Sequence, residues 1–409
     1  MIKYIHSSRI YTQYGLKSGF LKIKNKKISN ILSSPDENGE IFEYEDNRVI
    51  PGIIDVHNHG YGGWSMTDPV TVDIFHGYLK ACASIGITTV LPTTTKNSPA
   101  IEGIIEGMSA DCVGSKAYGI HSEGPFWARG GENTVGESWP DPSIEMTKDF
   151  IERAKGNLKV MAIAPELPGA HDVMKFLHEN GVKVAACHTK ANASQIREAM
   201  EDAGFDIVTH LCNGMQGIHH RDIGALGQYL LMDNLFYEII CDLNHVCADM
   251  LKLVFKIQPY DKFCLISDSN FISGMPAGIY NRYGKENISK ENGLIVDRHG
   301  RICGSGKCVL YNMHQLTDVV GVPFEKVIEM ASTNPARYLG IEGQTGSITP
   351  GKLADISVIS DDYTCIATFV DGNKVYDCNS DLNIFNQEAM KLRIGDLPED
   401  LTIRKSSDK

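Results

Sequence analysis

The stretch VIPGIIDVHNH, residues 49–59, decides how this sequence can fold. Its apolar run has the length of a buried strand, and the run ends in the two imidazoles of His57 and His59. Residues two apart on a strand point to the same side, so both rings can face one pocket. Asp55 shares that side and is a candidate to orient one of the rings. Alone, such a pair is at least as often structural as it is a ligand pair.

Residue types that bind metal ions also close other apolar runs. Glu123 closes AYGIHSE, His188 closes VKVAACH, His210 closes DIVTH, His245 closes FYEIICDLNH and Asp268 closes KFCLISD. A parallel barrel gathers the downstream ends of its strands at one face, where its active site lies. Residues far apart in sequence can therefore share one pocket. Imidazoles and carboxylates without paired thiols suit Zn²⁺ or Fe²⁺ with an open position for water.

Strand-like and helix-like runs alternate through the middle of the chain. The strand candidates are VIPGIIDVH, ITTVLPTTT, KAYGIHSE, LKVMAIAPE, VKVAACHT, FDIVTHLCN, LFYEIICDLN and KFCLISDSN. The helix candidates include TVDIFHGYLKACASIG, HDVMKFLHENG, ASQIREAMEDAG, ADMLKLVFKIQ, LYNMHQLTDVV, FEKVIEMAS and NPARYLG. Eight βα units over about 250 residues is the size of a (β/α)₈ barrel of the TIM type. We therefore assign residues 50–344 to an α/β barrel domain.

The two ends of the chain have a different pattern. Residues 1–49 alternate polar and apolar side chains, as in FLKIKNKKISNILSS, and residues 345–380 do the same between the turn sequences DDYT and DGNK. We expect both segments to pair into one small β-sandwich domain; two unrelated flaps are the alternative. Residues 381–409 predict a C-terminal helix and tail.

Bulk composition narrows the class of protein. The chain has 409 residues, of which 42% are hydrophobic, and this supports a large core. A net charge of −12 disfavours nucleic acid or an anionic membrane as a partner. The eleven cysteines form no CxxC pair, which favours buried, reduced thiols. The N-terminal MIKYIHSSRIYTQ has no apolar signal core, and no run approaches the length of a membrane span, so we expect a cytoplasmic protein.

Six motifs in a fixed order carry a family resemblance. Within residues 45–375 they are PGIIDVHNHG, HSEGPF, CHTKA, THLCNGM, LISDS and TNPARYLGIEGQTGSITPGKLADISVI. This succession resembles the amidohydrolase superfamily, and within it the N-acetylglucosamine-6-phosphate deacetylase family. The motifs EGPF, THLxN and PGKLAD are each weak evidence for the family alone, but together they are strong evidence. The family architecture, a (β/α)₈ barrel with a β-sandwich made from both chain ends, agrees with the pattern described above.

The resemblance implies a metal centre. Glu123, His188 and His210 match the metal triad of the family. Their combined charge of −1 leaves a divalent ion electrophilic enough to acidify water. His57 and His59 match a pair that, in some members, adds a second ion bridged by the same glutamate, whereas other members replace these histidines and use one ion. We expect one or two divalent ions, Zn²⁺ or Fe²⁺, per subunit, and the two histidines favour two.

Asp268 matches the catalytic aspartate of the family. Its implied role is general base toward water and then acid toward the leaving amine. Amide hydrolysis needs this second transfer because an unprotonated amine is a poor leaving group. The alternative is a helix-capping aspartate, since ISDSN is a good capping sequence.

Four further residues match substrate contacts. Arg221 matches an arginine that contacts the sugar phosphate, often from the neighbouring subunit, which implies a homodimer. A guanidinium fork suits phosphate. Asn213 and Gly214 match a pair that meets the phosphate or the sugar, and His245 matches another substrate-contacting histidine. The alternative for Arg221 is an exposed polar loop.

Two segments depart from the family pattern. After EGPF the family usually reaches a histidine that polarises the substrate carbonyl, but this chain has WARGGENTVGESWPDP. Arg129, Asn133 and Thr134 are candidates to supply that hydrogen bond. The Gly-rich segment FISGMPAGIYNRYGKENIS, after Asp268, is a candidate flap over the substrate.

These observations predict an enzyme, a metal-dependent amidohydrolase. It would convert N-acetylglucosamine 6-phosphate to glucosamine 6-phosphate and acetate. One alternative is an amidohydrolase acting on another N-acyl substrate, such as N-acetylgalactosamine 6-phosphate. A second alternative is a non-catalytic protein that binds amino-sugar phosphates.

Overall fold

A parallel sheet forms the centre of this computed structural model, which describes residues 2–95, 99–130 and 138–397. The sheet has nine strands, one of which, β10 (Lys116–Ala117), is a short addition on β9. The other eight pair in parallel, each with the next. They are β6 (Ile53–Asn58), β9 (Ile87–Thr95), β11 (Ile120–Phe126), β12 (Leu158–Ile163), β13 (Lys183–Ala186), β14 (Ile207–Val208), β15 (Phe236–Ile239) and β16 (Phe263–Leu265). All eight predicted strands are present.

The first and last strands meet just beyond their ends and close the barrel. The backbone N–H of Asp268 donates to the carbonyl of His57, and the N–H of His59 donates to the carbonyl of Ser269, each at 3.0 Å. Asn58 and Ser269 form a parallel bridge at the same place. Closure therefore holds Asp268 next to the two histidines of β6. The expected TIM-type barrel is confirmed.

A buried carboxylate fixes this seam. Asp55 on β6 is fully buried and accepts hydrogen bonds from Oγ of Ser267 at 2.6 Å and from Nδ2 of Asn58 at 3.0 Å. Burial raises the pKa of Asp55, and these two hydrogen bonds partly offset the increase. The carboxylate thus ties the first strand of the barrel to the last through polar contacts that water cannot replace.

Helices follow the barrel strands. They are α1 (Val72–Ala83), α2 (Ala100–Met108), α3 (Ile144–Arg153), α4 (Ala170–Glu179), α5 (Ala193–Asp202), α6 (Gly224–Leu230), α7 (Ala248–Ile257), α8 (Val309–His314), α9 (Phe324–Ile328) and α10 (Asn334–Leu339). Polar side chains begin several of them: Thr71 caps α1, Ser143 caps α3, and Asn192 forms a capping box on α5. Segments predicted as helices from their apolar spacing are helical.

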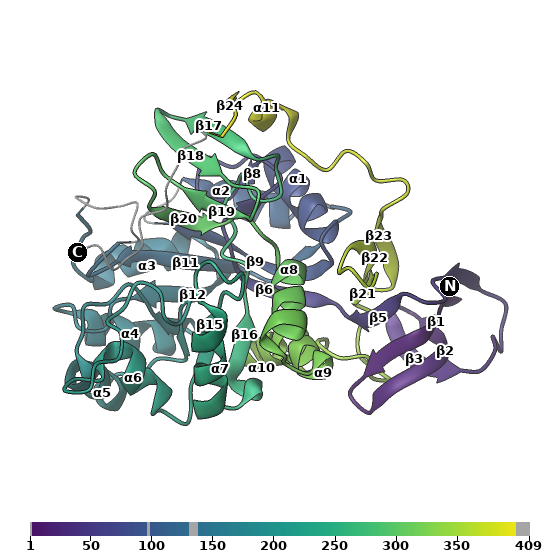
Figure 1. Cartoon of the computed structure of the whole chain (residues 1–409), viewed down its shortest axis with the longest axis horizontal. Helices are drawn as coiled ribbons and strands as arrows, with labels where there is room; N and C mark the ends of the chain where they lie inside the picture. The colour runs from purple at the N-terminus through teal and green to yellow at the C-terminus, as the bar shows by residue number, and fades with distance from the viewer. Residues whose placement is uncertain (1, 96–98, 131–137, 398–409) are drawn as a thin grey trace.

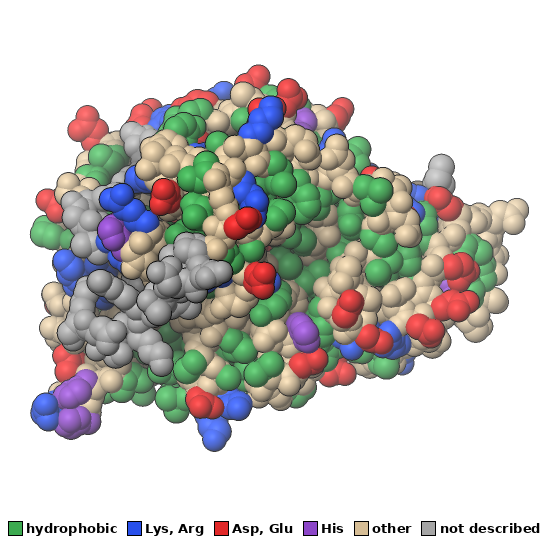
Figure 2. Space-filling view, turned by 45° about the horizontal axis from the view of Figure 1, so that its top comes forward, with side chains coloured by type: hydrophobic (Ala, Val, Ile, Leu, Met, Phe, Trp, Pro, Cys, Tyr) green, Lys and Arg blue, Asp and Glu red, His purple; other side chains and the backbone are tan. Residues whose placement is uncertain are grey.

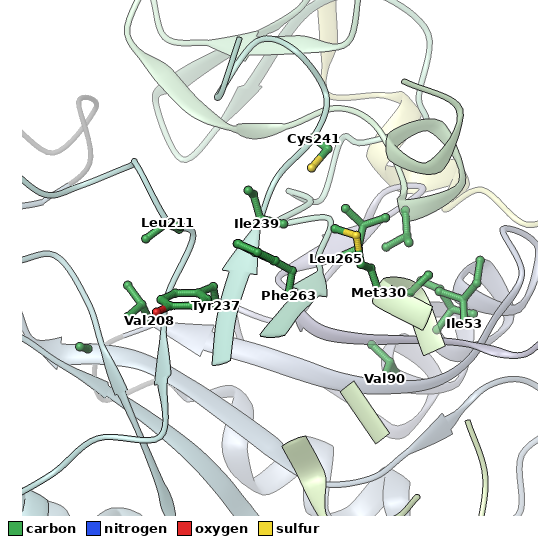
Figure 3. Packing of buried hydrophobic residues seen from close by; sticks show 14 of the residues in the cluster. Ile53, Val90, Val208, Leu211, Tyr237, Ile239, Cys241, Phe263, Leu265 and Met330 are labelled. Atoms are coloured by element: carbon green, nitrogen blue, oxygen red, sulfur yellow. The ribbon is translucent and has the colours of Figure 1, made fainter. Parts of the chain in front are cut away.

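Side chains alternate across the barrel wall, which explains why each strand reads as an almost continuous apolar run. Tyr237, Ile239, Phe263 and Leu265 of β15 and β16 belong to the large cluster that joins the strands to the helices (Figure 3). The intervening positions form a separate cluster inside the barrel: Ile54, Val56, Leu91, Val160, Ala162, Ala185, Cys187, Ile207, Ile240, Cys264 and Ile266. Tyr338 and Leu339 of α10 join this inner cluster at the end near the start of β15.

The two ends of the chain form a second sheet, beside the barrel in Figure 1. Its strands are β1 (Ile2–Thr12), β2 (Gly15–Lys24), β3 (Lys27–Leu32), β4 (Glu40–Glu43), β5 (Arg48–Pro51), β21 (Ile356–Ile359), β22 (Cys365–Val370) and β23 (Asn373–Asp377). β21 pairs antiparallel with β5, which joins the two ends. The expected domain from both chain ends is confirmed, whereas the boundaries 1–49, 50–344 and 345–380 stay a prediction.

A third, antiparallel sheet was missed by the sequence analysis. It contains β17 (Gly278–Arg282), β18 (Lys285–Ser289), β19 (Leu294–Val296), β20 (Ile302–Ser305) and β24 (Arg393–Gly395). The segment interpreted as a flap is its first hairpin, whose turn holds Tyr283 and Gly284 at positive φ. The turn sequences YG, ENG and RHG, which lie between its successive strands, could have indicated this sheet.

The chain after β23 crosses the molecule to reach this third sheet (Figure 1). The predicted C-terminal helix corresponds to the short α11 (Gln387–Met390), and β24 follows it and pairs with β17. Residues 398–409, predicted as a tail, lie outside the described residues.

The small hairpin of β7 (Gly60–Tyr61) and β8 (Trp64–Ser65) follows β6. Within the described ranges, no helix is long and apolar enough to cross a membrane.

Replacing the buried carboxylate of the seam should destabilise the barrel. Asp55→Ala leaves the buried donors of Ser267 and Asn58 without their acceptor, which should lower the free energy of unfolding by about 2–3 kcal/mol. Thermal unfolding followed by circular dichroism measures the effect. Asp111→Ala, at an exposed loop position, is the matched control and should change stability by less than about 0.5 kcal/mol. Equal midpoints for the two variants would contradict this role of Asp55.

Candidate metal centre and active site

Glu123, His188 and His210 meet at the downstream end of the barrel. Nε2 of His188 and Nε2 of His210 each lie 3.1 Å from Oε1 of Glu123. All three side chains are buried. Glu123 lies on β11, and the two histidines follow β13 and β14, so the barrel brings together positions that are distant in sequence.

His57 and His59 lie on the other side of the same carboxylate. Their Nε2 atoms are 3.2 Å apart, and Nε2 of His59 is 3.2 Å from Oε2 of Glu123. Oε1 of Glu123 is 3.8 Å from Nε2 of His57. Glu123 therefore lies between the two imidazole pairs: Oε1 faces His188 and His210 and also lies 3.8 Å from His57, whereas Oε2 faces His59. We call the pair His188–His210 with Glu123 the first half and the pair His57–His59 with Glu123 the second half.

Asp268 faces the second half. Its Oδ1 lies 3.5 Å from Nε2 of His57 and 3.4 Å from Nε2 of His59. The side chain of Asp268 is 15% exposed, so the carboxylate borders the cluster without being fully enclosed. The structure thus places the predicted catalytic aspartate beside all the predicted metal ligands of this half.

Three of these residues have an unusual backbone. His188, His210 and Asp268 adopt positive φ values of 46°, 30° and 47°. Residues other than glycine in this region cost about 1–3 kcal/mol each, and they persist where the surroundings impose them. Each residue lies where a strand ends and the chain turns outward, so the strain is concentrated at the site.

Gly214 packs directly against the first half. Its φ is +62°, and an added Cβ would lie 3.0 Å from Nδ1 of His188 and 3.5 Å from Cε1 of His210. The carbonyl of Gly214 also accepts from the backbone N–H of Thr189 at 3.0 Å. An added side chain would be tight against His188 and strained at this positive φ, which favours glycine at the position.

Glu238 is a site residue that the sequence analysis did not identify. Oε2 of Glu238, on β15, lies 2.8 Å from Nδ1 of His57, and both side chains are fully buried. A carboxylate on the far nitrogen fixes the tautomer and orientation of a metal-binding imidazole. The sequence analysis offered Asp55 for this role, but Asp55 reaches His57 only through its backbone N–H. The available signal was a glutamate inside the apolar run FYEIIC.

His121 lies below this pair, in the barrel interior. Its Nδ1 is 2.9 Å from the carbonyl of Val56, and its ring centre is 4.6 Å from that of His57. Burial lowers the pKa of His121 to about 4, and the charge of His57 acts in the same direction. The ring is therefore neutral at physiological pH and packs beneath the cluster.

The carboxylates of the site favour protonated imidazoles in the metal-free protein. Burial opposes the charge on His59, but hydrogen bonds to Asp268 and Glu123 outweigh it and raise the pKa of His59 to about 10. Burial also opposes the charge on His188, whose pKa is nevertheless raised to about 9 by its anionic neighbours. Burial disfavours the anions of Glu123 and Asp268, yet the surrounding imidazoles hold the pKa of each carboxyl below its usual range.

The donor set fits a divalent ion. Two ligands of a tetrahedral ion with bonds near 2.1 Å lie about 3.4 Å apart. The distances of 3.1 Å in the first half and 3.2 Å in the second half are close to this value. Glu123, His188 and His210 could hold one ion, and His57 and His59 could hold a second through the other oxygen of Glu123. Among the described residues, both halves form compact groups of potential ligands.

The predicted substrate residues lie at different distances from this cluster. Asn213 donates from Nδ2 to the carbonyl of His210 at 3.3 Å. Nδ1 of His245 is 2.8 Å from Asp242, and its side chain is 5% exposed. Burial opposes the positive charge of His245, but Asp242 raises its pKa.

Arg221 is not brought to the cluster in this chain. It is exposed, and its Nη1 donates to Nε2 of His220 at 2.7 Å. Its backbone N–H donates to Nδ1 of His219. Among the described residues, the hydrogen bonds of Arg221 go to His219 and His220 and not to a metal-binding residue.

The segment that lacks the expected histidine runs beside His188. The ring of Trp127 lies 4.4 Å from that of His188, and the backbone N–H of Arg129 donates to the carbonyl of His188 at 3.0 Å. Asn133 and Thr134, two of the three candidates to replace the missing histidine, lie outside the described residues.

Comparison with known proteins agrees with this site. The model of the amidohydrolase family matches residues 48–375. An N-acetylglucosamine-6-phosphate deacetylase from Vibrio furnissii is 30% identical over 84% of this chain and 90% of its own length. An N-acetylgalactosamine-6-phosphate deacetylase from Escherichia coli O157:H7 is 30% identical over 87% of this chain and 94% of its own. The crystal structure of N-acetylglucosamine-6-phosphate deacetylase from Pasteurella multocida superposes with a TM-score of 0.84 at 25% identity, over 91% and 99% of the two chains.

The chain belongs to the amidohydrolase family. The resemblance to amino-sugar-phosphate deacetylases in the sequence is thereby confirmed. Proteins of this family are metal-dependent hydrolases, and the cluster around Glu123 is a group of side chains that can hold such an ion.

Metal affinity should increase with pH. In the metal-free protein, His59 and His188 carry protons until the pH approaches about 10 and about 9, and an ion must displace them. Below pH 8 the apparent association constant for Zn²⁺ should therefore rise at least about tenfold per pH unit. Calorimetric titration in two buffers of different ionisation enthalpy measures the protons released. An affinity that is constant from pH 6 to pH 8, without proton release, would contradict the protonated cluster.

Removing the carboxylate behind His57 should weaken metal binding. Glu238→Ala should lower the Zn²⁺ affinity of the second half about 10–100-fold, whereas Glu238→Gln, which retains an acceptor oxygen, should lose less. Metal content after dialysis against graded chelator gives the affinities. Glu198→Ala, at an exposed position on α5, is the control. If Glu238→Ala retains metal as well as this control does, the carboxylate does not support His57.

Proposed function

We propose that this protein hydrolyses the acetamide of N-acetylglucosamine 6-phosphate to glucosamine 6-phosphate and acetate. The observation that carries the proposal is the position of Asp268 beside the pair His57–His59, which shares Glu123 with a second imidazole pair. A metal centre with an adjacent carboxylate suits amide hydrolysis, which needs an electrophile, a base and an acid. The names of the relatives reported above support an N-acetylated sugar phosphate as the substrate.

In this reaction, the metal ion, Asp268 and Glu238 have separate roles. When bound, a divalent ion supplies an electrophile that polarises the amide and acidifies water. Burial disfavours the anion of Asp268, but in the metal-free protein the charges of His57 and His59 hold its pKa below the usual range. A bound ion would supply that positive charge in their place, so Oδ1 of Asp268 can accept a proton from water. The same carboxyl then delivers a proton to the leaving nitrogen. Glu238 keeps His57 oriented during both transfers.

The number and kind of ions belong to the proposal. The presence of both His57 and His59 beside Glu123 favours two ions per subunit. Imidazole and carboxylate donors accept Zn²⁺ or Fe²⁺. The ligand types do not distinguish these two ions, so metal analysis of the purified protein is the direct assignment.

Substrate anchoring requires local positive charge. The chain has a net charge of −12, and acidic and basic side chains are interspersed over the face shown in Figure 2. We propose that His245, Asn213 and the backbone of Gly214 meet the sugar phosphate above the metal centre. Arg221 would reach the site of a neighbouring subunit, because it is exposed and makes its contacts away from its own cluster. The working form would be a homodimer.

The cell compartment follows from the cysteines. Five cysteines in the interior of the protein form no disulfide: Cys82, Cys187, Cys241, Cys264 and Cys365. Such thiols are typical of proteins in a reducing compartment. We therefore propose that the enzyme works in the cytoplasm on a small phosphorylated sugar.

N-acetylgalactosamine 6-phosphate is a second candidate substrate. The Escherichia coli relative named for that sugar is as similar to this chain as the Vibrio furnissii relative. The two sugars differ only in the configuration of one ring hydroxyl, far from the acetamide. Kinetics on both phosphorylated sugars, and on N-acetylglucosamine without phosphate, decide between them and measure the contribution of the phosphate.

Asp268→Asn should abolish most of the activity without abolishing substrate binding. Loss of the general base and acid should lower kcat by about 10²–10⁴-fold, because both proton transfers depend on this carboxyl. Acetate release from N-acetylglucosamine 6-phosphate with Zn²⁺ or Fe²⁺ measures the rate. Asp261→Asn, an exposed position near the start of β16, is the matched control and should retain full activity.

Binding without turnover by the metal-loaded wild-type protein would instead favour the non-catalytic alternative. Full activity of Asp268→Asn would remove Asp268 from the mechanism.

A further inference from the structure

A thiol lies beside the first half of the candidate metal centre. Sγ of Cys187 lies 3.9 Å from Oε1 of Glu123 and 3.9 Å from Nε2 of His210. One donor atom from each of Glu123, Cys187, His188 and His210 lies within 4.8 Å of the other three. All four residues are buried. Cys187 is therefore one of four groups that converge on one point.

The barrel wall aims this thiol at the site. Ala185 and Cys187 belong to the cluster inside the barrel, whereas Val184 and Ala186 belong to the cluster outside it. The N–H of Cys187 donates to the carbonyl of Ile163 at 3.0 Å, which continues the strand register beyond β13. The chain turns only at the next residue. The thiol thus approaches from the barrel interior, beneath the imidazoles.

The distances suit a shared ion. In a tetrahedral site with a metal–sulfur bond near 2.3 Å, sulfur lies about 3.5 Å from a nitrogen or oxygen ligand. The two distances from Sγ exceed this value by a few tenths of an ångström, a shift that a small rotation of a side chain can supply. Carboxylate, thiolate and two imidazoles are a donor set that Zn²⁺ accepts.

We propose that Cys187 is the fourth protein ligand of the ion held by Glu123, His188 and His210. Its S–H bond breaks on metal binding, the sulfur bonds to the ion as a thiolate, and the proton leaves to solvent. Zinc sites can expand from four to five ligands, so the first half can still accept water or substrate beside these four protein donors. This inference rests on the proposed metal-dependent function.

Cys264 is the comparison residue, because it is a buried cysteine that serves as a packing residue. It belongs to the same inner cluster and is equally buried, with 0% exposure for both side chains. Among the described residues, the groups that could hold a metal include Cys187 and do not include Cys264. Comparing the two cysteines therefore tests whether a cysteine must lie beside Glu123 and His210 to bind the ion, or whether burial alone is sufficient.

Cobalt spectroscopy tests the assignment. Metal-free protein is titrated with Co²⁺ to saturation, and the near-ultraviolet absorption is recorded for the wild type, Cys187→Ser, Cys187→Ala and Cys264→Ser. The wild type and Cys264→Ser should develop the intense thiolate-to-cobalt charge-transfer band with the first equivalents of the ion. Both Cys187 variants should lack this band, and their Zn²⁺ affinity at the first half should fall by more than about 100-fold, beyond the loss expected for a residue behind a ligand.

The outcomes separate this proposal from the proposed function. Stoichiometric Co²⁺ binding by the wild type without the band, or an unchanged band in Cys187→Ala, overturns the ligand assignment, whatever the deacetylase activity. If the Cys187 variants do not fold, the presence or absence of the band in the wild type and in Cys264→Ser decides. A wild-type protein that shows the band but releases no acetate from the sugar phosphates upholds the ligand and overturns the function.

Discussion

One carboxylate organises the functional end of this molecule. Glu123 lies between two imidazole pairs, with Oε1 at 3.1 Å from His188 and His210 and Oε2 at 3.2 Å from His59. A buried carboxylate surrounded by imidazoles needs positive charge, and protons supply it when a metal ion is absent. The same arrangement can exchange those protons for divalent ions. Metal binding depends on this shared contact, and His57 and His59, which border Glu123, also keep the pKa of Asp268 low.

The barrel makes that contact possible by joining its ends. Asp55, at the seam between β6 and β16, holds the strand that carries His57 and His59 against the strand that leads to Asp268. Glu238 then fixes the ring of His57 from the barrel interior. The chemistry is consequently supported by buried polar contacts below the site, whereas the groups that would meet substrate lie above it. A fold of parallel strands provides both layers because successive side chains alternate across its wall.

Much of this arrangement could be predicted from the sequence because its signals are local. Each apolar run ends at a polar residue, and the parallel barrel places those ends together, which is why Glu123, His188, His210 and Asp268 could be grouped in advance. The roles given to them rest on resemblance and stay a prediction. Glu238 and Cys187 were not identified because each lies inside an apolar run, where a charged residue or a thiol looks like an irregularity of the core. The sheet of β17–β20 was missed because its short strands have weak alternation and were assigned to the barrel.

The central claim is that the donors around Glu123 hold a metal ion. An anomalous difference map at the absorption edge of the bound metal, from crystals of the active protein, tests it most directly. The account predicts a peak about 2.0–2.3 Å from Glu123, His188 and His210. Active protein with no peak there, or with its metal bound elsewhere in the chain, would contradict the account.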